Sequence, residues 1–162
     1  MRLMQNHERD TRPLYRERLA PGLWLLVTIA LAGPMTTLVF LPAGSTTLAL
    51  VIGVLVSLLL VVASIAFSPV VAVADGELRA GRAHIDAGWL GEPEVYTGEE
   101  ARARRGPRLP GDGWHLIRGG IDGLVVVPIT DPADPVRSWS ISTRTPDRLA
   151  AAIRRAAGRP GR

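Results

Sequence analysis

The densest group of chemically active side chains lies in the second half of the chain. Five arginines fall within 17 residues there, with Asp112 as the single acid among them: Arg102, Arg104, Arg105, Arg108 and Arg118. A guanidinium group presents its donors in a planar fork that fits phosphates and carboxylates. Arg102, Arg104, Arg105 and Arg108 are therefore candidates for contact with anionic lipid headgroups or an acidic partner. A solvated surface without a ligand is the favoured interpretation of such a charge cluster.

The residue types that usually support catalysis or metal binding give no such pattern. The chain has no cysteine and no lysine, since all 19 basic residues are arginine, and this excludes thiolate metal sites and Schiff-base chemistry. His7, His84 and His115 lack the spacing of metal ligands. Prolines flank Asp131 and Asp134, which indicates a turn rather than a carboxylate pair. We predict no enzyme activity, no metal and no cofactor.

Two serines near the end of the chain follow a strand pattern rather than a nucleophile pattern. Ser140 and Ser142 alternate with Trp139 and Ile141, so the two pairs should point to opposite faces of a strand. We expect the aromatic and aliphatic side chains to face the core and the serines to face solvent.

The longest feature of the sequence is one uncharged stretch, residues 19–74, and the chain is organised around it. A helix needs about 20 apolar residues to cross a bilayer. The stretch predicts two such helices, at residues 22–41 and 47–67, joined by a turn at residues 42–46 that contains a proline and a glycine. A pair of buried helices in a soluble core and a cleaved signal peptide are the alternatives, and the length and continuity of the apolar stretch favour membrane spans.

Both predicted spans contain residues that favour close helix packing. Pro34 lacks a backbone donor and crowds the carbonyl group of Ala30, so we expect a kink there. Ala49, Gly53 and Ser57 recur every four residues and form a ridge of small side chains. This ridge is predicted either to contact the first span or to dock a second copy or another membrane protein. The first possibility is favoured because the first span is already tethered to it.

Arginines flank the two spans, and the turn between the spans has none: Arg12, Arg16, Arg18, Arg79 and Arg82. The positive-inside rule then places both termini in the cytoplasm. We predict a multi-pass protein of the cell inner (plasma) membrane. Its parts would be a polar, loosely ordered head at residues 1–18, a hairpin at residues 19–69, a cytoplasmic domain at residues 70–158 and a tail at residues 159–162.

The pattern after the second span changes to that of a small α+β domain. Asp75-Gly76 is a typical hairpin turn. A final helix is expected from Pro146 to about Ala157, with Thr145 as its N-cap and with Leu149, Ile153 and Ala156 as its buried stripe. Short strands and one further helix are expected between these points, with strands near residues 70–74, 77–83, 84–90, 94–97, 114–118, 124–129 and 137–142, and the helix near 101–105. A small bent sheet closed by a C-terminal helix is the pattern of a pleckstrin-homology-like (PH-like) domain.

The order of several short segments resembles a known family. The segments are Tyr15-Arg16-Glu17-Arg18-Leu19, Glu77-Leu78-Arg79-Ala80-Gly81, Arg105-Gly106-Pro107, and the stretch from Trp139 to Pro146. In this order the chain resembles an actinobacterial family of small two-span membrane proteins known only as a domain of unknown function. The resemblance covers nearly the whole chain. It implies residence in a membrane and no known activity.

These observations favour a protein that binds rather than one that catalyses. The main hypothesis is a transmembrane hairpin that anchors a cytoplasmic binding module for anionic lipid headgroups or a protein partner. An accessory or assembly subunit of a larger membrane complex is the alternative. A membrane enzyme ranks third and would need polar residues that converge on a pocket. The net charge of +4 is too small to indicate a nucleic-acid binder.

Overall fold

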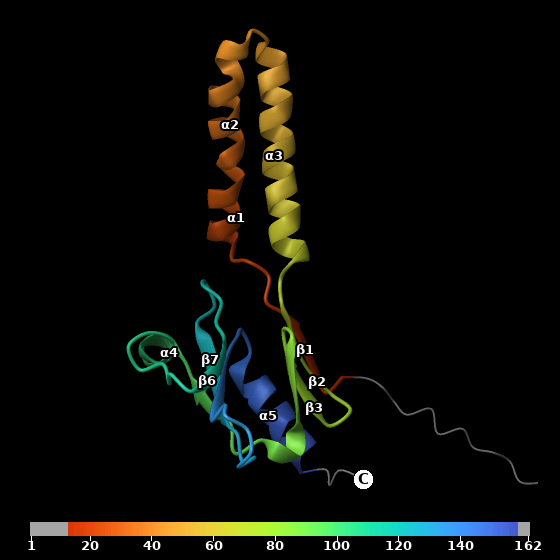
Figure 1. The fold of residues 1–162 in the computed structure, drawn as a ribbon, viewed down its shortest axis with the longest axis vertical. Coiled ribbons are helices and arrows are strands. Elements are labelled where there is room, and N and C mark those ends of the chain that lie inside the picture. Colours follow the sequence, from red (N-terminus) through yellow and green to blue (C-terminus); the bar gives the residue numbers. More distant parts are fainter. Residues whose placement is uncertain (1–12, 159–162) are drawn as a thin grey trace, which may run out of the picture. The chain divides into compact units, whose positions relative to one another are not determined.

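The computed structural model describes residues 13–158 (Figure 1), so most of the predicted head and the whole predicted tail lie outside the described residues. The chain forms two compact units. One unit is helical and contains residues 18–69 together with residues 118–121. The other contains the remaining helices and the strands, except for Arg18 at the end of the first strand. Each unit is described by itself.

The helical unit contains two antiparallel helical segments. The first segment consists of α1 (Leu23–Ala30) and α2 (Ala32–Phe40), and a short 3-10 turn, η1 (Leu41–Ala43), follows it. The second segment is α3 (Thr46–Ala66), whose first turn is capped by the hydroxyl group of Ser45. Both segments are long and apolar enough to cross a membrane, and most of their large apolar side chains are exposed. The α+β character and the two apolar helices predicted from the sequence are confirmed.

The first segment breaks at Leu31 for a reason that lies in Pro34. Proline has no N–H group, so the carbonyl group of Ala30 loses its normal partner one turn later. The hydroxyl group of Ser57, on α3, donates a hydrogen bond to that carbonyl oxygen at 3.0 Å. The second helix therefore satisfies the polar group that the proline leaves open.

The two segments touch most closely at a pair of glycines. A Cβ atom on Gly53 would lie 2.1 Å from the Thr37 hydroxyl oxygen and 2.6 Å from the Gly33 carbonyl oxygen. A Cβ atom on Gly33 would lie 2.9 Å from Cβ of Ser57. Ala49 and Gly53 are buried within this contact. The ridge of small residues thus faces the first segment of the same chain.

The other unit begins with a four-stranded sheet whose order is β1-β2-β3-β4. Figure 1 labels β1, β2 and β3 of this sheet. Its strands are β1 (Tyr15–Arg18), β2 (Val70–Ala74), β3 (Glu77–Ala80) and β4 (Ala83–Asp86). Asp75 and Gly76 form the predicted turn, with φ values of 52° and 78°. Strand β1 differs from the loosely ordered head that the sequence predicted. The predicted strand over residues 84–90 is also shorter, because η2 (Ala87–Trp89) replaces its second half.

A second four-stranded sheet has the order β5-β7-β8-β6. Its strands are β5 (Glu94–Tyr96), β6 (Gly113–Leu116), β7 (Gly123–Pro128) and β8 (Ser138–Thr143). Strand β7 pairs antiparallel with both of its neighbours, whereas β6 pairs parallel with β8. The helix α4 (Gly98–Arg105) contacts β7, and its residue Ala101 is buried against Leu124 and Val126.

The last helix, α5 (Pro146–Ala157), contacts strands of both sheets. Its buried residues include the predicted stripe of Leu149, Ile153 and Ala156. Trp139 and Ile141 of β8 are buried as well, so the predicted core of this domain is confirmed. The helix joins the two sheets because its apolar face is long enough to reach both.

The serines of β8 do not lie where the sequence predicted. Ser140 and Ser142 are fully buried, so the expectation that they face solvent is wrong. They share a face of the sheet with Val126 and Leu124, their register partners on β7, and that face of β7 is covered by α4. Alternation tells which residues share a face, but it does not tell whether another element covers that face.

The hydrogen bond at the break predicts a measurable coupling between Ser57 and Pro34. We expect Ser57→Ala to destabilise the contact between the helical segments by about 0.6 to 2 kcal/mol, the usual range for such bonds in a membrane. In a Pro34→Ala background the carbonyl group of Ala30 regains an N–H partner, so the same change should cost less. The measurement is a double-mutant cycle. It compares the free energies of unfolding, in bicelles, of the native chain, the two single variants and the double variant.

Ser64→Ala is the matched control, because the Ser64 hydroxyl group bonds only within its own helix, at 2.8 Å to the carbonyl oxygen of Val61. An equal cost of Ser57→Ala in both backgrounds would contradict the assigned role of this hydrogen bond.

Candidate functional site

The most connected polar cluster of the domain is centred on the carboxylate of Glu17. Its side chain is only 14% exposed. Oε2 accepts hydrogen bonds from the Tyr15 phenol at 2.5 Å and the Thr143 hydroxyl at 2.6 Å. Oε1 accepts from the backbone N–H of Arg144 at 3.0 Å, and the Arg144 guanidinium lies 3.6 Å away. Both oxygens therefore already have donors, and Glu17 is a structural anchor rather than a free general base.

The hydroxyl protons around Glu17 cannot serve every close contact, because Tyr15 and Thr143 both donate to Oε2 and leave no proton for the 2.9 Å contact between their own two oxygens. Since Tyr15 donates to Glu17, the phenol oxygen is left to accept from the hydroxyl group of Thr145 at 2.8 Å. Thr143 in turn accepts from the backbone N–H of Thr145 at 3.1 Å. Thr145 precedes α5, as the sequence predicted, but its side chain forms no hydrogen bond that caps the helix. That hydroxyl group is directed to Tyr15 instead.

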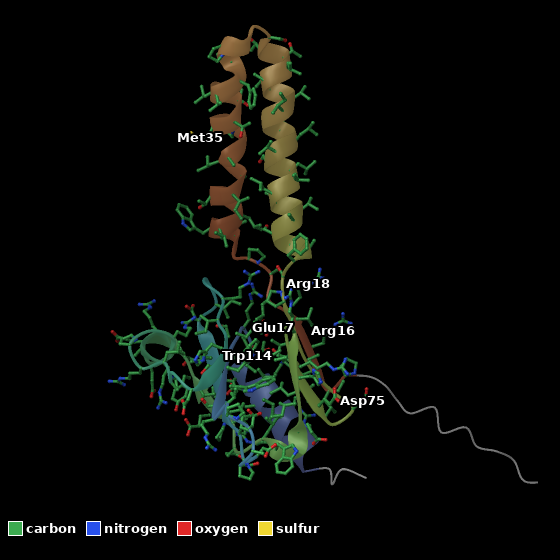
Figure 2. All side chains as sticks on the ribbon, viewed as in Figure 1. Arg16, Glu17, Arg18, Met35, Asp75 and Trp114 are labelled. Carbon is green, nitrogen blue, oxygen red and sulfur yellow. The ribbon has the colours of Figure 1, made fainter. Side chains whose placement is uncertain are left out.

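A groove of about 700 Å³ opens beside this network. One wall is the strand β1 with the two residues before it, residues 13–17. The other wall is formed by the start and one face of α5, and four arginines line the whole groove: Arg16, Arg144, Arg148 and Arg155. Within residues 13–158, Glu17 is the only acid that lines it. Figure 2 labels Arg16 and Glu17 on the strand. The groove is therefore strongly cationic.

The arginines that the sequence grouped together have different surroundings in the structure. Arg102 and Arg108 are exposed. The guanidinium of Arg104 stacks 4.4 Å above the ring of Tyr96. Arg105 donates hydrogen bonds to the carbonyl oxygens of Ala101, at 3.1 Å, and Asp122, at 3.4 Å. Two of the four predicted contact residues thus interact within the domain, and two remain accessible for a ligand.

Arg118 belongs to the helical unit and not to the domain that holds the other arginines. It lines a groove of about 510 Å³ between α1 and α3 and is the only charged residue there in the part of the chain that the structure describes. The other lining residues are mainly apolar: Pro21, Leu25, Ile29, Ala32, Leu60, Ala63, Ser64 and Phe67. The groove lies beside the start of α1 and the end of α3. The arrangement suits an amphiphile with an apolar chain and an anionic head.

The sequence did not identify the groove beside Glu17, although both of its walls contain segments that carried the family resemblance. One wall contains Tyr15 and Glu17, and the other contains Arg144 and Thr145. These segments are more than 120 residues apart, so no local spacing brings them together. Their juxtaposition is visible only in the folded domain.

The fold and these surfaces define a class of protein with two apolar helices of membrane-crossing length and an arginine-rich α+β domain. A family model, described as "Protein of unknown function (DUF3093)", matches residues 14–153, and the chain belongs to this family. At this level the resemblance inferred from the sequence is confirmed. The comparisons with curated proteins and with solved structures found no match.

The surroundings of Tyr15 predict an alkaline pH dependence. Burial raises the pKa of Tyr15 above its ordinary value of 10.0, and the hydrogen bond to Glu17 raises this pKa further. As the pH rises through about 10, the unfolded chain loses the phenol proton while the folded chain keeps it. The unfolded state then binds fewer protons, so the free energy of unfolding should fall as the pH rises.

An ultraviolet absorbance titration of the phenols checks this expectation directly. Tyr15→Phe should remove a late ionisation step and leave the step of Tyr96, the other tyrosine of the chain, whose pKa is also raised. Ionisation of Tyr15 at its ordinary value would contradict the assigned network.

Proposed function

We propose that the protein is a multi-pass protein of the cell inner (plasma) membrane whose helical hairpin anchors a cytoplasmic binding module for anionic lipid headgroups. The module is PH-like in this proposal, and two four-stranded sheets joined by a C-terminal helix support that assignment. The parallel pairing of β6 with β8 is a departure from a simple antiparallel meander.

The observation that carries the proposal is the exposure of the apolar helices. Leu23, Val39 and Leu59 are 79%, 73% and 69% exposed, and they represent a much longer set of exposed apolar side chains on both segments. Monomeric soluble proteins rarely expose continuous apolar surface of this extent. A bilayer would cover it, and each segment has the length that a crossing requires.

Contact with headgroups is supported by arginines that belong to the helical unit itself. Arg18 is exposed shortly before α1, and Arg118 lies at the groove between α1 and α3. An arginine close to an anionic leaflet contributes about 1 kcal/mol to membrane association. Arg18 and Arg118 belong to the same unit as the two apolar segments, whereas the exposed Arg102 and Arg108 belong to the other unit.

The packing of the hairpin favours this function over that of an accessory subunit. The ridge of Ala49, Gly53 and Ser57 was the docking face that the alternative hypothesis required. In the structure Gly53 packs on Gly33, and Ser57 bonds to the carbonyl group of Ala30 of the same chain. A partner subunit would therefore have to use another surface of the helices.

The proposed topology is tested by terminal reporter fusions. An enzyme reporter that is active only outside the cytoplasm should stay silent at both ends of the chain, because the arginines flank the spans on one side. The same reporter inserted in the turn at residues 42–46 should be active and is the positive control. Activity at either terminus would refute the topology.

Selectivity for anionic lipid is tested at Arg118. Native mass spectrometry of the full chain, released from detergent after incubation with phosphatidylglycerol or phosphatidylcholine, should show preferential retention of phosphatidylglycerol. Arg118→Gln should reduce this preference by about fivefold, as expected for about 1 kcal/mol per arginine. Arg137→Gln, at an exposed arginine of the other unit, is the matched control. An unchanged preference in the Arg118 variant would contradict headgroup binding at this groove.

A further inference from the structure

We propose that the groove between β1 and α5 binds an extended acidic segment of a partner protein, which adds to the open edge of β1 as a further strand. This surface belongs to the domain and is distinct from the lipid contact proposed for the helical unit. The inference concerns a protein ligand and does not depend on the headgroup contact.

The first argument is the position of β1 at the edge of its sheet. Among the strands that residues 13–158 form, the order is β1-β2-β3-β4, and β1 has a neighbour on one side only. Five consecutive residues, 13–17, line the groove, and the last three belong to β1, so its wall follows the backbone into the strand rather than a single side chain. An open strand edge offers N–H and C=O groups in a row, and an extended peptide can pair with them.

The second argument is the row of cations on the opposite wall. Arg148 and Arg155 line the groove from the same helix, seven residues apart, which corresponds to about 10 Å along the helix axis. Arg144 continues the row before the helix begins. In an extended segment every second side chain points the same way, at a spacing of about 7 Å. Acidic residues at alternate positions could therefore reach successive arginines, which are long and flexible.

The network at Glu17 fixes both walls before a ligand arrives. Glu17 belongs to β1 and accepts from Thr143 and Arg144, which connect β8 to α5. Its carboxylate is already satisfied and repels an acidic ligand less than a free acid would, since Arg144 lies beside it. Preorganised walls lower the entropic cost of binding.

The charge of the groove also discriminates among occupants. A second copy of the chain would bring another Tyr15-Arg16-Glu17-Arg18 strand, with exposed Arg16 and Arg18, and would meet the arginines of α5. Like charges disfavour that pairing. A phosphate-bearing headgroup would use the arginines but would leave the strand edge without partners. An acidic strand is the ligand that uses both walls.

The test is a titration of the full chain in neutral detergent with a fluorescent nine-residue peptide of alternating glutamate and valine, read as fluorescence anisotropy. We expect saturable binding that becomes about tenfold weaker in the double variant Arg148→Gln/Arg155→Gln, since two exposed charge pairs together contribute on the order of 1.4 kcal/mol. Arg154→Gln is the matched control, because Arg154 is on the same helix but pairs with Glu92 and does not line the groove.

A second peptide separates strand addition from simple charge attraction. It has the same sequence but carries N-methyl groups at alternate residues, which remove the donors that pair with a strand edge. We expect it to bind at least tenfold more weakly than the parent peptide. Equal binding of the two peptides would overturn strand addition, and equal binding by the wild-type chain and the double variant would overturn the site.

Inorganic tripolyphosphate and vesicles that contain phosphatidylglycerol are the remaining probes. Two results together would show that the groove is a simple anion site and that the proposal is wrong. The first is that either probe displaces the peptide from the native chain but not from the Arg148→Gln/Arg155→Gln variant. The second is that the methylated peptide binds as tightly as the parent peptide. The titration in detergent needs no bilayer, so its failure would leave the reporter-fusion result for the hairpin unaffected.

Discussion

The requirement that the largely buried carboxylate of Glu17 be satisfied organises the part of the domain where β1, the end of β8 and the start of α5 meet. A carboxylate removed from water is costly unless several donors surround it. Here the donors come from β1 itself and from the end of β8, which are far apart in the sequence. Removal of these donors would leave a buried charge without partners, so the strand, the turn before α5 and the start of that helix are held as one structure.

The position of β1 has a consequence for the apolar segment that follows it. Strand β1 comes directly before the helical hairpin and β2 comes directly after it, and the two strands are neighbours in one sheet. The backbone N–H of Leu19 also donates to the carbonyl oxygen of Pro69 at 2.9 Å, which ties the two ends of the hairpin together. Within the hairpin, Ser57 compensates the carbonyl group that Pro34 leaves open. Both ends and the middle of this segment are therefore fixed by specific hydrogen bonds.

Much of the fold could be predicted because it depends on local patterns. The uncharged stretch predicted the two helical segments, Asp75-Gly76 predicted the turn, and the period of the last helix predicted its buried face. Strand β1 could not be predicted, because a short charged segment has no apolar alternation and becomes a strand only through its partners. The burial of Ser140 and the separation of Arg118 from the other arginines likewise depend on which elements pack together, which no local spacing contains.

Hydrogen exchange of individual backbone amides tests the organising role of Glu17 most directly. In the native chain the amide of Arg144, which donates to Glu17, and those amides of β1 that face β2 should be protected from exchange. Glu17→Ala should abolish the protection of Arg144 and reduce that of the β2-facing amides of β1. The amides of β7 should keep their protection, because the pairing of β7 with β5 and β8 does not involve Glu17. Unchanged protection of Arg144 and β1 in this variant would contradict the account.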